Sequence, residues 1–300
     1  MLNHNHTNEV YPERVVVLGA SGFIGSEIVA KLHEKNILVL PLSKKDINLL
    51  DSGASNLLLD LLNPGDVLIF VSALAPCKDL IMLQDNLKMV SAVCSALQKC
   101  PLEHLIYISS DAVYKDSSTP IIEASCAEPS SLHGVMHLAR EIALKQYYSG
   151  PLTVIRPTLV YGSNDPHNGY GPNRFRRMAS SGQSITLFGN GEECRDHVYV
   201  GDVADLICRV VLMRSTGIIN AVSGGVVSFR ELAEFVAGEF NPIVSVSGGI
   251  RVGEMPHGGY RAFDNSAVNE AFPDFKFKFW REGLRLVHSQ QRSDSGSESL

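Results

Sequence analysis

Apolar residues follow two different periods along the first half of the chain. Short apolar runs rich in β-branched residues predict buried strands, and segments with apolar residues every three or four positions predict helices. Alternating strands and helices imply an α/β fold, in which a parallel sheet carries helices on both faces. The predicted strands cover residues 14–18, 37–42, 66–72, 104–109 and 152–156, and the predicted helices cover residues 23–33, 85–98 and 132–148.

The pattern becomes looser after Gly162, where loops rich in Gly, Asn and Pro interrupt it at residues 163–173 and 189–193. Ligand-binding loops concentrate where a regular scaffold ends. We therefore expect a large domain over residues 14–162 and a smaller, interleaved substrate lobe over residues 163–288. Within that lobe, about residues 195–222 are expected to return to the large domain. The ends, residues 1–13 and 289–300, are expected to be flexible.

Composition narrows the classes of partner. The 300 residues carry 26 Lys and Arg against 32 Asp and Glu, a formal net charge of −6, which gives no general electrostatic reason to bind nucleic acid or an anionic membrane. No run of about 18 apolar residues predicts a membrane span, and the first fourteen residues lack a signal-peptide pattern. Six scattered cysteines without a CxxC pair fit a reducing cytoplasm. These features indicate a cytoplasmic protein that binds small molecules.

Three glycines follow the first predicted strand with a spacing that suits a bound phosphate. Gly19, Gly22 and Gly25 lie in GASGFIG, between that strand and the next predicted helix. The first glycine permits a tight turn, the second lets the backbone approach a pyrophosphate, and the third allows close helix packing. Amide groups at the helix start can then hold the anion. The neighbouring residues expected to contact this ligand are Ser21, Phe23 and Ile24.

The G-x-x-G-x-x-G spacing in this context resembles the extended short-chain dehydrogenase/reductases, the NAD-dependent nucleotide-sugar epimerase/dehydratase family. The resemblance covers about residues 14–287. It implies a doubly wound Rossmann fold that binds NAD or NADP. The resemblance also implies further residues of the cofactor domain. These are a pair that contacts the adenine, an Ala-rich wall, an Asn that braces the sheet and a Pro in the crossover, which correspond in turn to Asp46 and Ile47, to Ser72, Ala73, Leu74 and Ala75, to Asn86 and to Pro157.

The end of the second predicted strand bears on the choice between the two cofactors. NAD-binding proteins place an acidic residue there to accept the ribose hydroxyls. This chain instead has Ser43, Lys44 and Lys45 before its first carboxylate, Asp46. A hydroxyl and two cations could accommodate a 2′-phosphate, which favours NADP over NAD, although the two lysines could equally form a solvated turn.

The segment YISSDAVYKD, residues 107–116, resembles the family's S-[ST]-x-x-V-Y-G segment. The resemblance assigns to Ser110 the hydrogen bond to the reacting sugar oxygen, a task for which a hydroxyl can both donate and accept. Asp111 falls where the 4,6-dehydratases carry an Asp general acid, and it could instead cap the segment that follows. Ala112 replaces their Glu, which weakens a dehydratase assignment because elimination also needs a base.

The largest departure from the family lies at its Tyr-x-x-x-Lys pair. Pro129, Gly134 and Glu141 keep the register of the family helix, yet His133 stands at the Tyr position and His137 at the Lys position. A spacing of four places both histidines on one helical face. His137 could still contact the nicotinamide ribose. A metal is not expected here, because two histidines need further ligands and an HExxH context is missing from the sequence.

Three interpretations of the histidine pair remain open. His133 could replace Tyr as the acid/base, since an imidazole titrates near neutral pH. Proton transfer could pass to Asp111, Ser110 or a group of the substrate, as in a variant dehydratase or epimerase. Alternatively, the site could be degenerate, so that the protein only binds a nucleotide or a nucleotide sugar.

Polar residues in the second half are the candidates for substrate recognition. The segment GNGEECRDHVYVGD resembles a family segment whose arginine binds the diphosphate of the nucleotide sugar, and Arg195 stands at that position. A guanidinium suits this role because it is permanently charged and can donate two parallel hydrogen bonds. Asp196 is expected to orient that guanidinium. Arg261 belongs to a stretch that resembles the late segment closing over the nucleotide. The asparagines expected to contact the substrate are Asn164, Asn168 and Asn173.

The resemblance implies an NAD(P)-dependent epimerase or dehydratase that acts on a nucleotide-diphosphate sugar by hydride exchange at a sugar carbon, in polysaccharide or deoxysugar synthesis. A keto-sugar reductase and a catalytically degenerate nucleotide-binding regulator are the alternatives. Family dimers pair through the helices predicted at residues 85–98 and 132–148, so a homodimer is expected. The sequence leaves the sugar and its nucleotide open.

Overall fold

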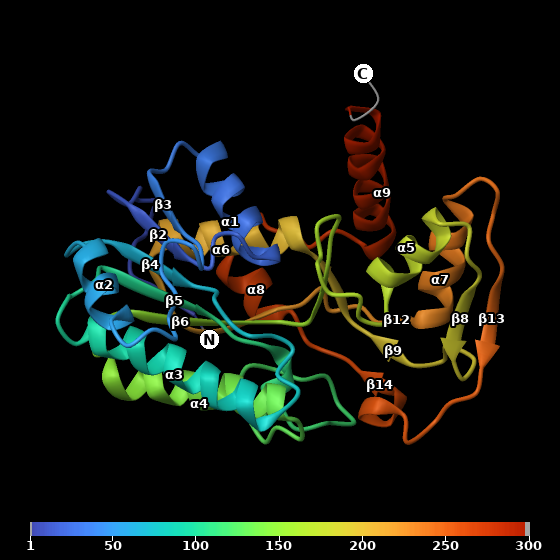
Figure 1. The fold of residues 1–300 in the computed structure, drawn as a ribbon, viewed down its shortest axis with the longest axis horizontal. Helices are drawn as coiled ribbons and strands as arrows, with labels where there is room; N and C mark the ends of the chain where they lie inside the picture. Colours follow the sequence, from blue (N-terminus) through green and yellow to red (C-terminus); the bar gives the residue numbers. More distant parts are fainter. Residues whose placement is uncertain (1, 298–300) are drawn as a thin grey trace.

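The computed structural model describes residues 2–297, and a seven-stranded sheet forms the centre of its larger lobe (Figure 1). The strand order is β1-β11-β6-β5-β4-β2-β3. Its described pairings are parallel except that of β1 with β11. The strands are β1 (Asn3–His4), β2 (Val15–Leu18), β3 (Val39–Leu42), β4 (Val67–Phe70), β5 (His104–Ile108), β6 (Leu152–Pro157) and β11 (Ser215–Ala221).

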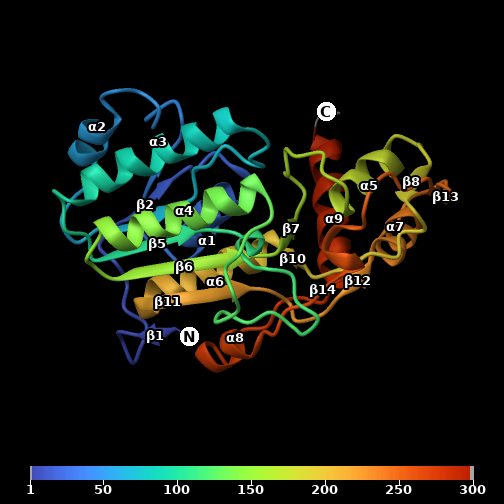
Figure 2. The same cartoon turned by 90° about the horizontal axis from the view of Figure 1, so that it is seen from below.

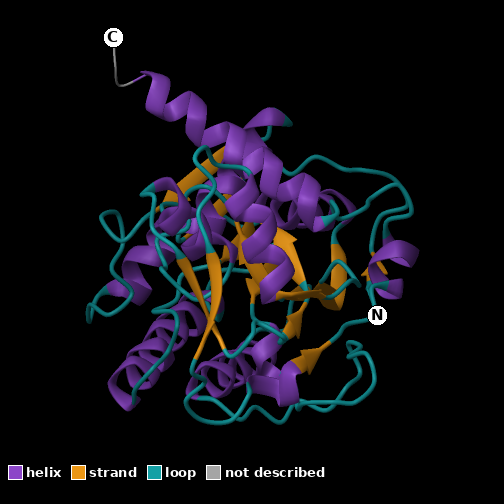
Figure 3. Ribbon diagram, turned by 90° about the vertical axis from the view of Figure 1, so that its right-hand side faces the viewer, coloured by secondary structure: helices purple, strands orange, loops and turns teal. Residues whose placement is uncertain are grey.

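Helices cover both faces of this sheet, which confirms the predicted doubly wound α/β fold (Figures 2 and 3). Successive residues of β2 point to opposite faces, as a strand requires. Val15 and Val17 pack with α1 and α6, whereas Val16 and Leu18 pack with α2, α3 and α4. The helix bounds are α1 (Phe23–Glu34), α2 (Ala54–Leu61), α3 (Leu80–Leu97), α4 (Leu132–Tyr147) and α6 (Val200–Met213).

A smaller lobe, to the right in Figure 1, is interleaved with the larger one. Between its segments the chain returns through β10 (His197–Tyr199), which pairs with β7 (Leu159–Tyr161), and then through α6 and β11. The remaining elements are α5 (Pro172–Ser180), β8 (Ile185–Phe188), β9 (Cys194–Arg195), β12 (Val227–Ser228), α7 (Phe229–Gly238), β13 (Val246–Gly249), β14 (Tyr260–Arg261), α8 (Ser266–Ala271) and α9 (Trp280–Ser297).

Some elements lie where the apolar pattern predicts none. Strand β1 falls in the segment expected to be flexible, and α9 extends through residues 289–297 of the expected flexible tail, whose last residues, 298–300, lie outside the described residues. Helix α2 occupies a run of leucines too short to show a helical period. Helix α3 begins before the predicted residue 85, because the Asp79 side chain caps it by accepting the Met82 N–H at 2.8 Å.

Within the described residues, α3 is the one helix whose length and apolar composition would allow it to cross a membrane. Core helices of globular domains share this property, so it is weak evidence of a membrane span. Here Val90, Val93 and Leu97 are buried in the core beneath the helix. The position of α3 beside α4 on one face of the sheet accounts for its apolar composition (Figure 2).

Helix α4 is fixed to the sheet by a buried ion pair. Glu141 is fully buried and accepts Arg156 Nε at 2.9 Å and Arg156 Nη2 at 2.6 Å. It also accepts the Ser109 hydroxyl at 2.6 Å, so the carboxylate joins α4 to β6 and to the end of β5. Near the start of α4, a Cβ on Gly134 would lie 2.0 Å from the Ala112 carbonyl oxygen. The helix and the segment after β5 therefore hold a fixed relative position.

We predict that Glu141→Gln lowers the free energy of unfolding by about 3–5 kcal/mol, because removing one partner leaves the buried Arg156 without its counter-ion. Guanidinium chloride unfolding of the purified protein measures the change. Glu234→Gln is the matched control, since its exposed pair with Arg230 contributes less than about 1 kcal/mol. Equal losses in the two variants would show that the buried pair does not anchor α4.

Candidate functional site

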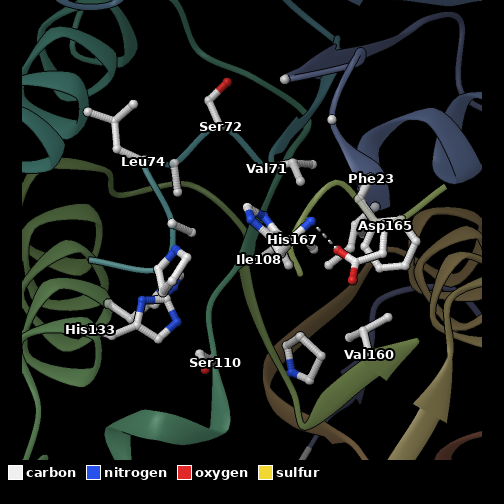
Figure 4. A pocket seen from close by; sticks show the side chains of 18 of the residues that line it. Phe23, Val71, Ser72, Leu74, Ile108, Ser110, His133, Val160, Asp165 and His167 are labelled. Atoms are coloured by element: carbon white, nitrogen blue, oxygen red, sulfur yellow. Dashed lines mark hydrogen bonds between the residues drawn. The ribbon is translucent and has the colours of Figure 1, made fainter. Parts of the chain in front are cut away.

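A cavity of about 690 Å³ opens between the two lobes, at the carboxyl ends of β2, β4, β5 and β6. The strand order reverses beside β2, because β3 lies on one side of it and β4 on the other. Open parallel sheets bind their ligands at this place. Figure 4 shows Ser110 and His133 on one side of the cavity, with Phe23 and Val160 on the other.

Most of the predicted site residues meet at this cavity, and seven others lie outside its described lining. The predicted residues that line it are Gly19, Ser21, Gly22, Phe23, Ile24, Lys44, Ile47, Ser72, Ala73, Leu74, Ala75, Ser110, Asp111, His133, His137, Pro157, Asn173 and Arg195. Those outside the described lining are Gly25, Ser43, Asp46, Asn86, Asn164, Asn168 and Arg261.

The glycine turn between β2 and α1 leaves room for a ligand but for no side chain. Gly19 has φ of 104°, and a Cβ there would lie 2.7 Å from the Ser72 amide nitrogen. A Cβ on Gly25 would lie 2.1 Å from the Gly19 carbonyl oxygen, so Gly25 supports the turn from beneath. Gly22 precedes α1 and offers no capping side chain, so first-turn amides remain for an anion. This cradle fits the pyrophosphate of a dinucleotide.

The loop after β3 holds the residues expected at the ribose. Asp46 accepts the Ser43 amide at 2.8 Å and the Ser43 hydroxyl at 2.6 Å. The hydroxyl bond and then the amide bond lower the pKa of Asp46. Ser43 and Asp46 thus bind each other, whereas Lys44 lines the cavity together with Asn48, which the sequence analysis did not single out.

Asn86 braces the wall that follows β4. Its Oδ1 accepts the Leu74 amide at 3.0 Å, and its Nδ2 donates to the Leu74 and Met82 carbonyls at 3.0 and 2.9 Å. The residue is fully buried. It therefore fixes residues 72–75 from behind and holds the shape of the wall that a cofactor would meet.

Arg140 supports the same wall and was missed by the sequence analysis. It is fully buried, donates to the Ser72 carbonyl at 2.7 Å, and places its guanidinium 4.3 Å from the centre of the Phe70 ring. Burial lowers the pKa of Arg140. An arginine in a helix is usually exposed to solvent. In the sequence, only its position three residues after His137 could have indicated a role at the site.

The two histidines of α4 pack edge to face, with ring centroids 4.7 Å apart. His137 is buried, and its Nδ1 lies 2.8 Å from the Tyr107 hydroxyl on β5. Burial raises the pKa of Tyr107, so the phenol keeps its proton and forms a hydrogen bond with this ring nitrogen. Burial, followed by His133 and Arg140, lowers the pKa of His137 well below its usual value. His137 is therefore a neutral ring whose orientation Tyr107 fixes.

His133 lies closer to the cavity opening and is also neutral. Burial lowers its pKa, and the nearby Asp111 carboxylate acts in the opposite direction. The Cys77 amide nitrogen lies 3.4 Å from His133 Nδ1, which is long for a hydrogen bond. This weak contact leaves the ring nitrogen able to bind another group. A neutral imidazole beside a carboxylate can accept a proton, because the carboxylate stabilises the imidazolium that forms.

Ser110 and Asp111 take different roles in the segment after β5. Ser110, not Asp111, caps the 3-10 turn at Asp111–Val113, because its hydroxyl accepts the Ala112 amide at 3.2 Å. Asp111 Oδ2 accepts Arg261 Nε at 3.1 Å and lies 3.9 Å from Arg195 Nη2. A carboxylate between two guanidinium groups favours an electrostatic role over that of a general acid.

The structure corrects the expected partner of Arg195. Asp196 does not orient its guanidinium, because this buried carboxylate instead accepts the Ser223 and Gly224 amides at 3.1 and 2.8 Å. Burial raises the pKa of Asp196 to about 6. Glu193 takes the expected place and accepts Arg195 Nη1 at 3.2 Å. Arg195 is thus held at the cavity by Glu193 and Asp111.

The other substrate candidates divide between the cavity and its surroundings. Asn173 lines the cavity and donates to Asp165 Oδ2 at 2.7 Å. Asn168 instead accepts Arg177 at 3.3 Å, outside the described lining. Arg261 is buried against the segment after β5, where it donates to the Asp111 carbonyl at 2.7 Å. It orders Asp111 and does not face the cavity.

Known proteins share both the family and the fold. Residues 15–221 match the model of the NAD dependent epimerase/dehydratase family. A putative UDP-glucose 4-epimerase from Methanocaldococcus jannaschii is 28% identical over 75% of this chain and 82% of its own length.

Two solved UDP-glucose 4-epimerases have the same fold. The enzyme from Thermotoga maritima, solved with UDP-glucose, has a TM-score of 0.83 and 20% identity over 94% of this chain and 99% of that chain. The enzyme from Thermus thermophilus, in complex with NAD, has a TM-score of 0.82 and 24% identity over 93% and 99% of the two chains. With the glycine cradle at the reversal of strand order and a family match over most of its length, the chain belongs to the NAD dependent epimerase/dehydratase family.

Proposed function

We propose that the protein is an NAD(P)-dependent enzyme of epimerase or dehydratase type that acts on a nucleotide-diphosphate sugar. The observation that carries this proposal is one cavity that joins the glycine turn, Ser110 and His133 to Arg195 of the smaller lobe. A dinucleotide and a second phosphate-bearing ligand can therefore meet beside an acid/base group. Synthesis of a polysaccharide or a deoxysugar is the corresponding biological role.

The protein's own residues would hold the two ligands from opposite sides. The Gly19–Gly25 turn would bind the cofactor pyrophosphate, and the wall at Ser72 and Leu74 would bound the cofactor along its length. Arg195 would bind the diphosphate of the sugar nucleotide with its forked guanidinium. When bound, the nicotinamide supplies the hydride acceptor and donor for oxidation and reduction of a sugar carbon.

His133 is the proposed acid/base in place of the family Tyr. The neutral ring can take the proton of the reacting sugar hydroxyl, and the negative charge of Asp111 favours the imidazolium so formed. Ser110 would hydrogen-bond the same sugar oxygen. His137, oriented by Tyr107, would face the nicotinamide ribose, where the family places Lys. Ala112, at the position where the 4,6-dehydratases carry Glu, weighs against dehydration.

We predict measurable turnover of at least one nucleotide sugar in a panel of UDP-, GDP- and dTDP-sugars. His133→Phe should lower kcat by about 100-fold or more, as loss of an acid/base group does, while the affinity for the cofactor stays the same. His33→Phe, on the exposed face of α1, is the matched control. The acid limb of the wild-type pH–rate profile should lie below pH 6.5, because His133 must be neutral to accept a proton.

Three outcomes would contradict this assignment. Cofactor binding without turnover across the whole panel would support the alternative, a catalytically degenerate regulator. Unchanged chemistry in His133→Phe would remove His133 from the reaction. Turnover of keto sugars alone, with net consumption of reduced cofactor, would support the second alternative, a keto-sugar reductase.

NADP is the proposed cofactor, with NAD the alternative. Lys44 lines the cavity at the ribose end, where a 2′-phosphate would meet its ammonium group. We predict that Lys44→Ala raises the Kd for NADPH about tenfold, the loss expected for one charged hydrogen bond, and leaves the Kd for NADH unchanged. Lys45→Ala, outside the described lining, is the control. Fluorescence titration measures the six affinities of wild type and the two variants for the two cofactors. Equal loss for both cofactors in Lys44→Ala would contradict a 2′-phosphate contact.

A homodimer through α3 and α4 is the proposed assembly. These helices lie side by side on one face of the sheet (Figure 2). Their exposed apolar residues include Leu87, Val135 and Ile142, with 37%, 39% and 59% of their surfaces exposed. We predict a dimer in sedimentation velocity that Ile142→Glu weakens, whereas Leu57→Glu on α2 does not. A wild-type monomer at every concentration would contradict the assembly.

A further inference from the structure

His197 is a cavity residue for which the family resemblance assigns no role. It lies on β10, two positions after Arg195, and both residues line the cavity. Only 2% of its surface is exposed, and its ring packs edge to face against Phe229 with centroids 5.5 Å apart. The ring therefore has a fixed orientation within the cavity wall.

The hydrogen bond to the backbone determines which ring nitrogen carries the proton. His197 Nδ1 lies 3.2 Å from the Arg195 carbonyl oxygen, and a carbonyl oxygen can only accept. Nδ1 is therefore the donor. Burial, followed by the charge of Arg195, lowers the pKa of His197 to about 3, so the ring is neutral near pH 7. In this tautomer Nε2 carries a lone pair and acts only as an acceptor.

Nε2 of His197 is buried and has no hydrogen-bond partner among the described residues. Buried polar atoms in proteins are nearly always paired, and an unpaired one is costly because it has lost its water. In the part of the chain that the structure describes, Arg195 Nε is likewise buried without a partner. Two residues of the cavity lining, two positions apart, thus each carry an unpaired buried polar atom, a donor on Arg195 and an acceptor on His197.

We propose that His197 Nε2 accepts a hydrogen bond from a substrate hydroxyl close to the diphosphate that Arg195 binds, and so selects nucleotide sugars that carry this hydroxyl. The inference rests on the proposed function. Two hydroxyl groups of a nucleotide sugar fit the description, the one on the hexose carbon next to the phosphate-bearing carbon and the one at the ribose 3′ position, which is the ribose hydroxyl nearer to the diphosphate. A site built around a hydrogen bond rejects an analogue that lacks the partner, because the buried acceptor then stays unpaired.

The test compares equilibrium binding of UDP-glucose, UDP-2-deoxyglucose and 3′-deoxy-UDP-glucose by calorimetry, in the presence of the cofactor. The wild-type protein should bind UDP-glucose about tenfold more tightly than one of the two deoxy analogues. The analogue that is penalised identifies the hydroxyl. In His197→Phe, which keeps an aromatic ring but has no acceptor, this preference should fall to within about twofold.

A matched pair of amides separates hydrogen bonding from packing. The side-chain amide of Gln can place an oxygen near the position of Nε2, whereas the shorter Asn cannot reach it. His197→Gln should retain most of the preference and His197→Asn should lose it, which also keeps the test decisive if the Phe variant does not fold. An unchanged preference in the Phe and Asn variants, or equal weakening of all three ligands, would overturn the inference.

Failure of the inference and failure of the proposed function give different results. If wild-type protein binds none of UDP-glucose, GDP-mannose and dTDP-glucose, the proposed function is wrong. If it binds one of the other two nucleotides instead, its deoxy analogues replace those of UDP-glucose in the same comparison. If it binds a nucleotide sugar but shows no preference that depends on His197, the function stands and the inference fails.

Discussion

The buried contact between α4 and the segment after β5 is the constraint on which the site depends. Glu141 joins Arg156 and Ser109 beneath the helix, and Gly134 brings the helix against the Ala112 carbonyl. Together these contacts place the helix that carries His133 beside the segment that carries Ser110 and Asp111. Because the anchor does not involve the histidine rings, the residues at positions 133 and 137 can change in type while the helix keeps its place.

Neutrality is the electrostatic consequence of this arrangement. The family's Lys would bring a positive charge next to the acid/base group, whereas here burial keeps His137 uncharged and Tyr107 fixes its orientation. The ionised group that acts on His133 is Asp111, a carboxylate balanced by Arg261 and Arg195, whereas the Arg140 guanidinium acts on His137. A negative neighbour assists a neutral base that becomes charged, whereas a positive neighbour assists a phenol that becomes an anion. The charges around His133 therefore suit a neutral base, just as the family's Lys suits a Tyr that loses its proton.

The apolar pattern and the glycine turn were enough to predict the fold, because two-sided burial of parallel strands and a strained turn both leave local signals. The cavity residues of the turn followed from the same signals, whereas those of the wall followed from the resemblance to the family. Side-chain pairing did not, since it depends on contacts distant in the sequence: Glu193 rather than Asp196 holds Arg195, and Arg261 binds Asp111 across 150 positions. The sequence could not predict that His197 Nε2 is an acceptor either, because the tautomer of the ring is set by its hydrogen bond to the Arg195 carbonyl.

The central claim is that an imidazole has taken over the proton transfer of a scaffold built for a phenol. A crystal structure with NADPH and a bound nucleotide sugar tests it most directly. The account predicts that a ring nitrogen of His133 and the Ser110 hydroxyl both lie within about 3 Å of one sugar oxygen, the distance of a hydrogen bond. A sugar whose reacting oxygen is bound by other groups, with His133 turned away from it, would contradict the account.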